Sequence, residues 1–191
     1  MSSARDIVIV LIEEGIAARA HFQVWWALRN RAVPRFLPTM NNFDYVDFFH
    51  ASNAGHYKLF LLALSKIFDR DTRVAGLKTL RTQLQSEGRA DLAKYIGTRL
   101  NPLQSRITAV MGIRSQSIVH NNHALPRAKV YQLNGITPNQ LRELIDKTSD
   151  VINHVAGELG ITNTIFDSDR SERATLRMLE VLERGNKVRA S

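Results

Sequence analysis

Apolar residues recur at helical spacing along most of the chain, and no stretch alternates convincingly with the period of a β-strand. In the first segment, residues 5–31, the side chains of Ile9, Ile12, Ile16 and Phe22 follow the i, i+3/i+4 rhythm of one helix face. A helix with one apolar face must bury that face against other helices or sheets. Since no strands are expected, the pattern predicts an all-α fold.

Five further helices are expected along the chain. They cover roughly residues 44–68, 74–85, 91–119, 137–159 and 171–184. The clearest start is at Thr137, with Pro138 at the first helical position and Gln140 completing a capping box. Asp44 is a candidate N-cap for the second helix.

Proline and glycine predict where these helices end. Pro34 and Pro38 should close the first helix, and Asn101-Pro102 should break or kink the segment 91–119. Glycines close the last two helices in this prediction, at Gly160 and Gly185.

The length of 191 residues fits one domain with a sizeable core. We therefore expect residues 1–191 to form a single helical bundle of five or six helices. Its core would be residues 43–159, with the N-terminal and C-terminal helices packed on it. The chain has no cysteine, which excludes disulfides, thiolate nucleophiles and cysteine-based zinc sites.

The formal net charge of +8 favours a polyanionic partner, of which RNA or DNA is the commonest. Arginine is more frequent than lysine, and its planar fork suits phosphate oxygens and stacks on bases. The apolar run Ile7–Ile12 is far too short to span a bilayer. We expect a cytoplasmic protein without a membrane partner.

The segment IRSQSIVHNNH joins a permanent cation to a titratable side chain. Arg114 lies six positions before His120, which is followed by Asn121, Asn122 and His123. A phosphate-binding group thus stands beside the side chain best suited to moving protons near neutral pH.

Two stretches taken in order resemble the abortive-infection branch of the HEPN superfamily. The first is the aromatic-led helix DFFHASNAGHYKLFLLALSKIFDR, and the second is the Arg-x5-His segment just described. The resemblance covers roughly residues 43–155. It implies an α-helical domain that dimerises, cleaves RNA without a metal ion or cofactor, and acts as a toxin or phage-defence effector, with an antitoxin as a candidate partner. Arg114 and His120 match the catalytic pair of the family, and Ser115 stands where many members carry Asn, Asp or His.

The chemistry of metal-free RNA cleavage suits this pair. A histidine with an ordinary pKa of about 6.5 can serve as acid or base, whereas arginine holds the phosphate and stabilises transition-state charge. On one ideal helix, Arg114 and His120 would point about 120° apart. Either the helix ends or distorts between them, or a second subunit contributes. We expect a composite site built by both protomers of a homodimer.

The neighbouring polar residues Ser115, Asn121, Asn122 and His123 are candidate substrate-binding groups. The asparagines could equally be ordinary helix-ending residues. No metal site is expected at His123, because no carboxylate accompanies the two histidines locally.

Two other readings remain open. Ser115 favours a non-catalytic helical module that binds RNA, a nucleotide or a partner protein. Alternatively, Arg114 could be engaged in internal ion pairs in a purely structural protein.

Other groups favour structural roles over functional ones. Trp25 and Trp26 should pack in a core or dimer interface. The remaining groups are the basic cluster Arg29, Arg31 and Arg35, the histidines His50 and His56, and the charged helix end Asp69, Arg70, Asp71 and Arg73.

Overall fold

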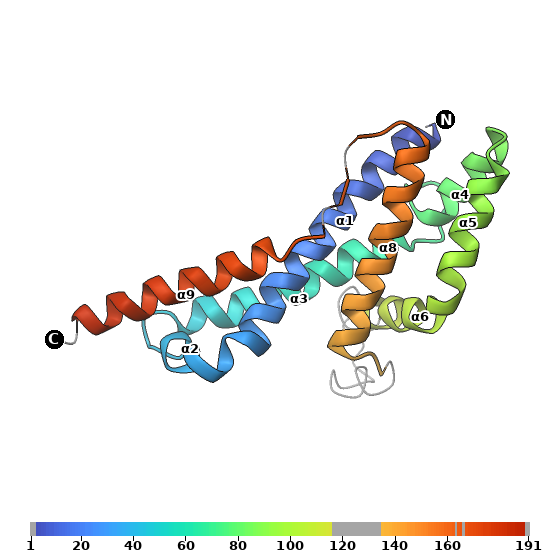
Figure 1. Ribbon diagram of the computed structural model, residues 1–191. Helices are drawn as coiled ribbons and strands as arrows, with labels where there is room; N and C mark the ends of the chain where they lie inside the picture. The colour runs from blue at the N-terminus through green and yellow to red at the C-terminus, as the bar shows by residue number, and fades with distance from the viewer. Residues whose placement is uncertain (1–2, 116–134, 163, 166, 190–191) are drawn as a thin grey trace. The chain divides into compact units, whose positions relative to one another are not determined.

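The computed structural model describes residues 3–115, 135–162, 164–165 and 167–189. These residues form α-helices, π-helical turns and one 3-10 turn, with no strand among them (Figure 1). The predicted all-α fold is confirmed. The helices are α1 (Ala4–Trp26), α2 (Val33–Met40), α3 (Val46–Ile67), α4 (Leu77–Ser86), α5 (Ala90–Leu100), α6 (Gln104–Ile113), α8 (Pro138–Glu158) and α9 (Arg170–Arg189). None of the helices described is long and apolar enough to cross a bilayer.

Contacts between residues divide the chain into two compact units, and the division falls within α1 and α3. Unit 1 contains Met1–Ala18 and Leu61–Asp167, and unit 2 contains Arg19–Phe60 and Ser168–Ser191. The expectation of a single domain over residues 1–191 stays a prediction. Each unit is described by itself below.

Unit 1 contains the helical hairpin of α4 and α5, which lie side by side (Figure 1). Gly88, in the turn between them, has φ +77°, a left-handed conformation that glycine adopts without steric cost. Helices α5 and α6 both pack on α8. The core of this unit includes the fully buried side chains Leu11, Leu61, Leu64, Ile67, Leu80, Leu84, Ile96, Ile113, Leu144 and Ile152.

The sequence signals of unit 1 are borne out where they depend on local chemistry. The 3-10 turn Asn101–Leu103 separates α5 from α6, so the predicted kink at Asn101-Pro102 is confirmed. The Thr137 hydroxyl accepts from the Gln140 amide at 3.3 Å, and the Gln140 side chain accepts from the Thr137 amide at 2.8 Å. The capping box therefore begins α8 as predicted.

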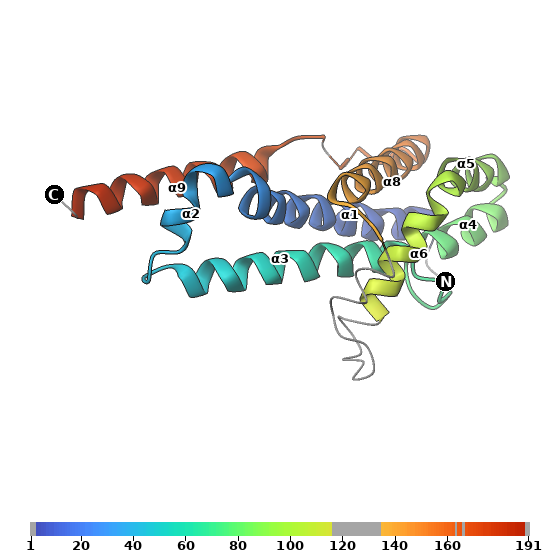
Figure 2. The ribbon, with the colours of Figure 1, turned by 90° about the horizontal axis from the view of Figure 1, so that it is seen from below.

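In unit 2, α9 packs on α2 and on the π-helical turn Ala27–Arg31 (Figure 2). The interface is apolar at its centre, around Leu28, Phe36 and Leu179. Ion pairs surround it. Arg31 pairs with Glu172 at 3.1 Å, and Arg35 pairs with Glu180 at 3.3 Å and with Glu183 at 3.0 Å.

The tryptophans of unit 2 contribute to an aromatic cluster, as the structural reading predicted. Its rings lie 5.2–6.3 Å apart between centroids and belong to Phe22, Trp25, Trp26, Tyr57 and Phe60.

In unit 2, one helix was missed and two predicted helix boundaries were wrong. Residues 33–40 form a helix of their own, α2, because Pro34 occupies its first turn, where no amide donor is needed. Helix α3 begins at Val46, so Asp44 is not its N-cap. Helix α9 continues through Gly185 to Arg189, held beyond the glycine by a hydrogen bond of 3.3 Å from the Tyr45 hydroxyl to Asn186.

Candidate active site

Arg114 lies where the regular part of α6 ends. It is the C-cap residue of α6, with φ −56° and ψ −51°, and it continues with Ser115 into a π-helical turn. Single π-helical turns occur frequently at functional sites. The regular part of α6 therefore ends at the arginine, and the residues between Ser115 and His120, where the helix is expected to end or distort, lie outside the described residues.

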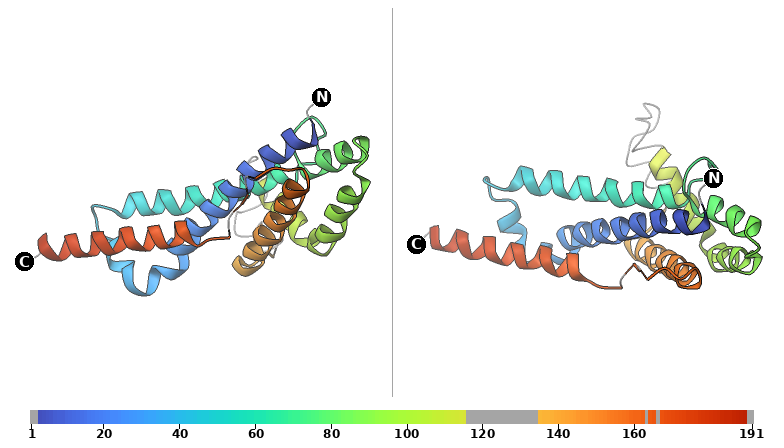
Figure 3. Two further views of the ribbon diagram at one scale, coloured as in Figure 1. Left: turned by 45° about the horizontal axis from the view of Figure 1, so that its top comes forward. Right: turned by 90° about the horizontal axis from the view of Figure 1, so that it is seen from above.

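Helix α6 is firmly placed within unit 1. Its inner face buries Ile107, Val110 and Ile113. An ion pair of 2.7 Å between Arg106 and Glu143 joins it to α8, which lies beside it (Figure 3). Arg114 thus extends from a rigid element, which suits a group that must hold a substrate in position.

The face of α6 explains how far Arg114 is buried. Seven residues turn an α-helix by about 700°, so Arg114 lies only about 20° around the axis from Ile107 and on the same side. Ile107 is buried. Arg114 is accordingly half-buried rather than extended into solvent.

The guanidinium of Arg114 contains a buried donor without an acceptor. Its Nε atom is shielded from solvent and has no hydrogen-bond partner among the described residues. No carboxylate of the described residues forms an ion pair with Arg114 either. A buried unsatisfied donor costs about 1–3 kcal/mol, a penalty that an anionic ligand would remove.

The remaining predicted site residues divide into two groups. The side chain of Ser115 is exposed beside Arg114. The predicted proton carrier His120 and the candidate substrate-binding residues Asn121, Asn122 and His123 lie outside the described residues. The site geometry therefore rests on Arg114 and Ser115. Within the described part of the chain, no three His, Asp or Glu side chains are grouped as a metal site requires.

Sequence reasoning missed a pair of histidines within unit 2. His21 of α1 and His56 of α3 place their Nδ1 atoms 2.9 Å apart. Burial lowers the pKa of both imidazoles, and the charge of His21 lowers the pKa of His56 further. The two residues are 35 positions apart in sequence, so no local pattern indicates the pair.

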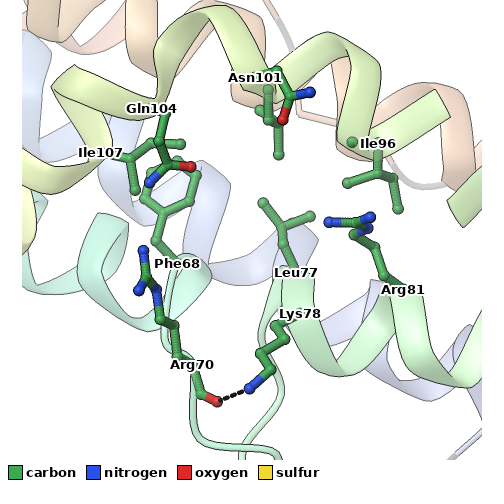
Figure 4. A pocket seen from close by; sticks show the side chains of 11 residues that line it. Phe68, Arg70, Leu77, Lys78, Arg81, Ile96, Asn101, Gln104 and Ile107 are labelled. Carbon is green, nitrogen blue, oxygen red and sulfur yellow. Dashed lines mark hydrogen bonds between the residues drawn. The ribbon is translucent and has the colours of Figure 1, made fainter. Parts of the chain in front are cut away.

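A second missed feature is a basic pocket in unit 1, formed where α4 faces α5 and α6 (Figure 4). The sequence indicated only a charged helix end at residues 69–73. Within that segment, Asp71 and Arg73 do form an ion pair, at 2.6 Å, and hydrogen bonds from Arg73 lower the pKa of Asp71 to about 2. Arg70, in contrast, lines the pocket.

Comparison with known families agrees with the helical fold. The chain belongs to the HEPN superfamily, in its abortive-infection branch. A model of one family in this branch, described as AbiU2, matches residues 1–175. The match extends well beyond residues 43–155, on which the resemblance was based. No curated protein and no solved structure matched the chain.

Proposed function

We propose that this protein is a metal-independent endoribonuclease of the HEPN type that acts as an abortive-infection effector. The observation that carries the proposal is the state of Arg114. This permanent cation is half-buried, lacks a carboxylate partner among the described residues, and keeps its Nε donor unsatisfied. A phosphate oxygen would accept from that donor, and the net charge of +8 would attract the RNA.

The reaction needs only groups that the chain and its substrate supply. The 2′-hydroxyl of the RNA loses its proton to a base and attacks the adjacent phosphorus. The bond from phosphorus to the 5′-oxygen breaks, and that oxygen takes a proton from an acid. His120 supplies the base or the acid, and Arg114 stabilises the charge on the phosphorane. The products are a 2′,3′-cyclic phosphate and a 5′-hydroxyl.

A homodimer would place two such pairs in one cleft, each with its arginine from one protomer and its histidine from the other. Ser115, Asn121, Asn122 and His123 are proposed to bind ribose or phosphate around the scissile bond. An antitoxin partner would restrain the activity in the cell.

The proposal is tested by incubating purified protein with total RNA in excess EDTA. We expect cleavage by the wild type, with the end groups given above. Arg114→Ala should slow cleavage by about 10²–10³-fold, the usual cost of removing a preorganised donor. Arg114→Lys should restore little, because an ammonium lacks the planar fork. Arg99→Ala, a loss of an exposed arginine on α5, is the matched control and should cleave normally.

Ser115 favours a second candidate function, a non-catalytic RNA-binding module. It is exposed beside Arg114 and replaces the Asn, Asp or His that many relatives carry. In that case Arg114→Ala would weaken RNA binding and reduce its salt dependence, and no cleavage product would form with any variant.

A further inference from the structure

The basic pocket of unit 1 combines positive charge with an apolar floor. It has a volume of about 430 Å³, within the range of small-molecule sites. Three basic side chains line it, Arg70, Lys78 and Arg81, and no carboxylate does among the described residues. Three cations on one concave surface attract an anion, although the charge of Asp71 also acts on Lys78.

The basic side chains are available for a ligand. No ion pair or side-chain hydrogen bond within the described residues engages the guanidinium of Arg70 or of Arg81. The Lys78 ammonium donates one hydrogen bond, of 3.1 Å, to the backbone carbonyl of Arg70, which leaves its other donors unused. Figure 4 shows the guanidinium groups of Arg70 and Arg81 reaching toward α5 and α6 from opposite ends of the pocket.

A glycine makes room for one of these cations. The Arg81 guanidinium lies against α5 at Gly97, where an added Cβ would be 3.2 Å from Nη2 and 3.4 Å from Cζ. Such contacts are tighter than side chains usually make, so a residue larger than glycine would shift the guanidinium. A side chain at position 97 would therefore move the charge of Arg81 slightly away from α5.

The rest of the pocket suits a nucleobase. Leu77, Ile96 and Ile107 are buried and form an apolar floor. The carboxamides of Asn101 and Gln104 line the opposite side of the pocket from Arg70 and Arg81 (Figure 4). Carboxamides hydrogen-bond both the donors and the acceptors on a base edge, whereas guanidinium groups bind phosphate.

We propose that this pocket binds one nucleotide unit, with its phosphate on Arg81 beside Gly97 and its base on the apolar floor beside Asn101 and Gln104, while Arg70 at the other end of the pocket adds attraction for the anion. The unit is either a free nucleotide or one nucleotide of an RNA strand. The position of α6 is compatible with an RNA strand in the pocket. Ile107 lies on the same side of α6 as Arg114, about 10 Å away along the axis. An RNA strand bound in the pocket would thus continue toward the proposed cleavage site. Only this version of the inference, and not the free-nucleotide version, rests on the proposed function.

The test measures binding to the full-length His120→Ala protein, so that no cleavage interferes. The probes are the four nucleoside 5′-monophosphates, the matching nucleosides and a labelled ten-nucleotide RNA. Arg81→Gln removes the phosphate contact, Arg70→Gln removes the second cation, and Gly97→Ala shifts the Arg81 guanidinium slightly without changing the charge. Arg99→Gln is the matched control, because Arg99 is exposed on α5 and does not line the pocket.

We expect Arg81→Gln and Arg70→Gln each to weaken binding at least tenfold, and Gly97→Ala to weaken it less. Arg99→Gln should change affinity less than twofold, and nucleosides should bind more weakly than their monophosphates. Saturable binding of a monophosphate identifies a free-nucleotide site. If the pocket substitutions weaken only the binding of the RNA, the pocket is a site for one nucleotide of an RNA strand.

The proposal is overturned if Arg70→Gln and Arg81→Gln weaken the binding of neither the monophosphates nor the RNA. It is also overturned if Arg99→Gln weakens binding as much as they do. Circular dichroism of each variant establishes that it is folded. Binding that depends on the pocket in a protein that never cleaves RNA would refute the proposed nuclease and leave this inference standing.

Discussion

His21 and His56 show how burial and a neighbouring charge lower the pKa of an imidazole. The Nδ1 atoms of His21 and His56 are 2.9 Å apart, so one ring donates its proton and the other accepts it. Protonating both rings would place two donors and two positive charges face to face. Burial lowers the pKa of each imidazole, and the charge of His21 lowers the pKa of His56 further.

The histidine pair predicts that the protein loses stability in mild acid. Because the folded pKa values lie below the unfolded value of about 6.5, the unfolded chain binds more protons as the pH falls through that value. The free energy of unfolding should therefore decrease as the pH drops from 6.5, by at most about 1.4 kcal/mol per pH unit for each proton, and by less for these half-exposed rings. Urea denaturation at several pH values measures this slope.

A double variant isolates the effect of the pair. His21→Gln combined with His56→Gln should make the free energy of unfolding nearly independent of pH between pH 6.5 and 5. The control His50→Gln, at an exposed position on α3, should leave the pH dependence unchanged. The carboxylates with lowered pKa values, such as Asp71, lose their charge only below about pH 4 and do not interfere. A slope that persists in the double variant would contradict the assignment.

At the scale of the helices, the sequence predicted boundaries that depend on local chemistry. The capping box at Thr137 and the kink before Pro102 require only neighbouring residues, and both are confirmed. Pro34 is compatible with a helix start as well as a helix end, so the sequence alone did not indicate α2. The last turn of α9 depends on a contact between distant segments, Tyr45 with Asn186, and sequence patterns do not contain that information. The same reason explains why the basic pocket was missed, since its side chains come from several helices.

Two glycines on helices predict opposite effects of adding a methyl group. At Gly15 of α1, a new Cβ would overlap with the buried side chain of Ile165, whose backbone is held by hydrogen bonds of 2.9 and 2.7 Å to Asn153. Gly15→Ala should therefore lower the free energy of unfolding by about 1–3 kcal/mol. At Gly97, a new Cβ would contact only the end of the flexible Arg81 side chain. Because alanine has the higher helix propensity, Gly97→Ala should raise the free energy of unfolding by about 0.5–1 kcal/mol.

Thermal and urea denaturation of the two variants test this contrast. The comparison is internal, since both substitutions add one methyl group within a helix of unit 1. If both variants were stabilised, Ile165 would be able to move away from α1, and the close packing described at Gly15 would not limit that helix.

At the scale of the whole molecule, the fold class and the family could be predicted from the sequence, and the active assembly could not. Helical periodicity and two motifs indicated an all-α HEPN protein, and the family match confirms this. In the proposed nuclease, the residues that surround a phosphate depend on how Arg114, His120 and a second copy of the chain come together. Local spacing does not determine that arrangement.

A composite site predicts that two inactive variants restore each other. If Arg114 of one protomer acts with His120 of the other, a dimer of Arg114→Ala with His120→Ala keeps one intact site of two. Mixing and re-equilibrating the variants should recover about one quarter of wild-type activity, because half of the dimers are then mixed. No recovery from a verified dimer would place both residues of each site on one chain.

The rate of RNA cleavage without metal tests the central claim most directly. The measurement is the first-order rate constant for cleavage of a defined RNA in excess EDTA, for wild type, His120→Ala and the control His154→Ala. His154 is exposed, and its ring lies beside that of Tyr95 on α5. We predict cleavage by wild type and by the control, and a loss of about 10²–10⁴-fold in His120→Ala. Equal rates for wild type and His120→Ala, or no cleavage by any of the three, would contradict the assignment of a HEPN nuclease.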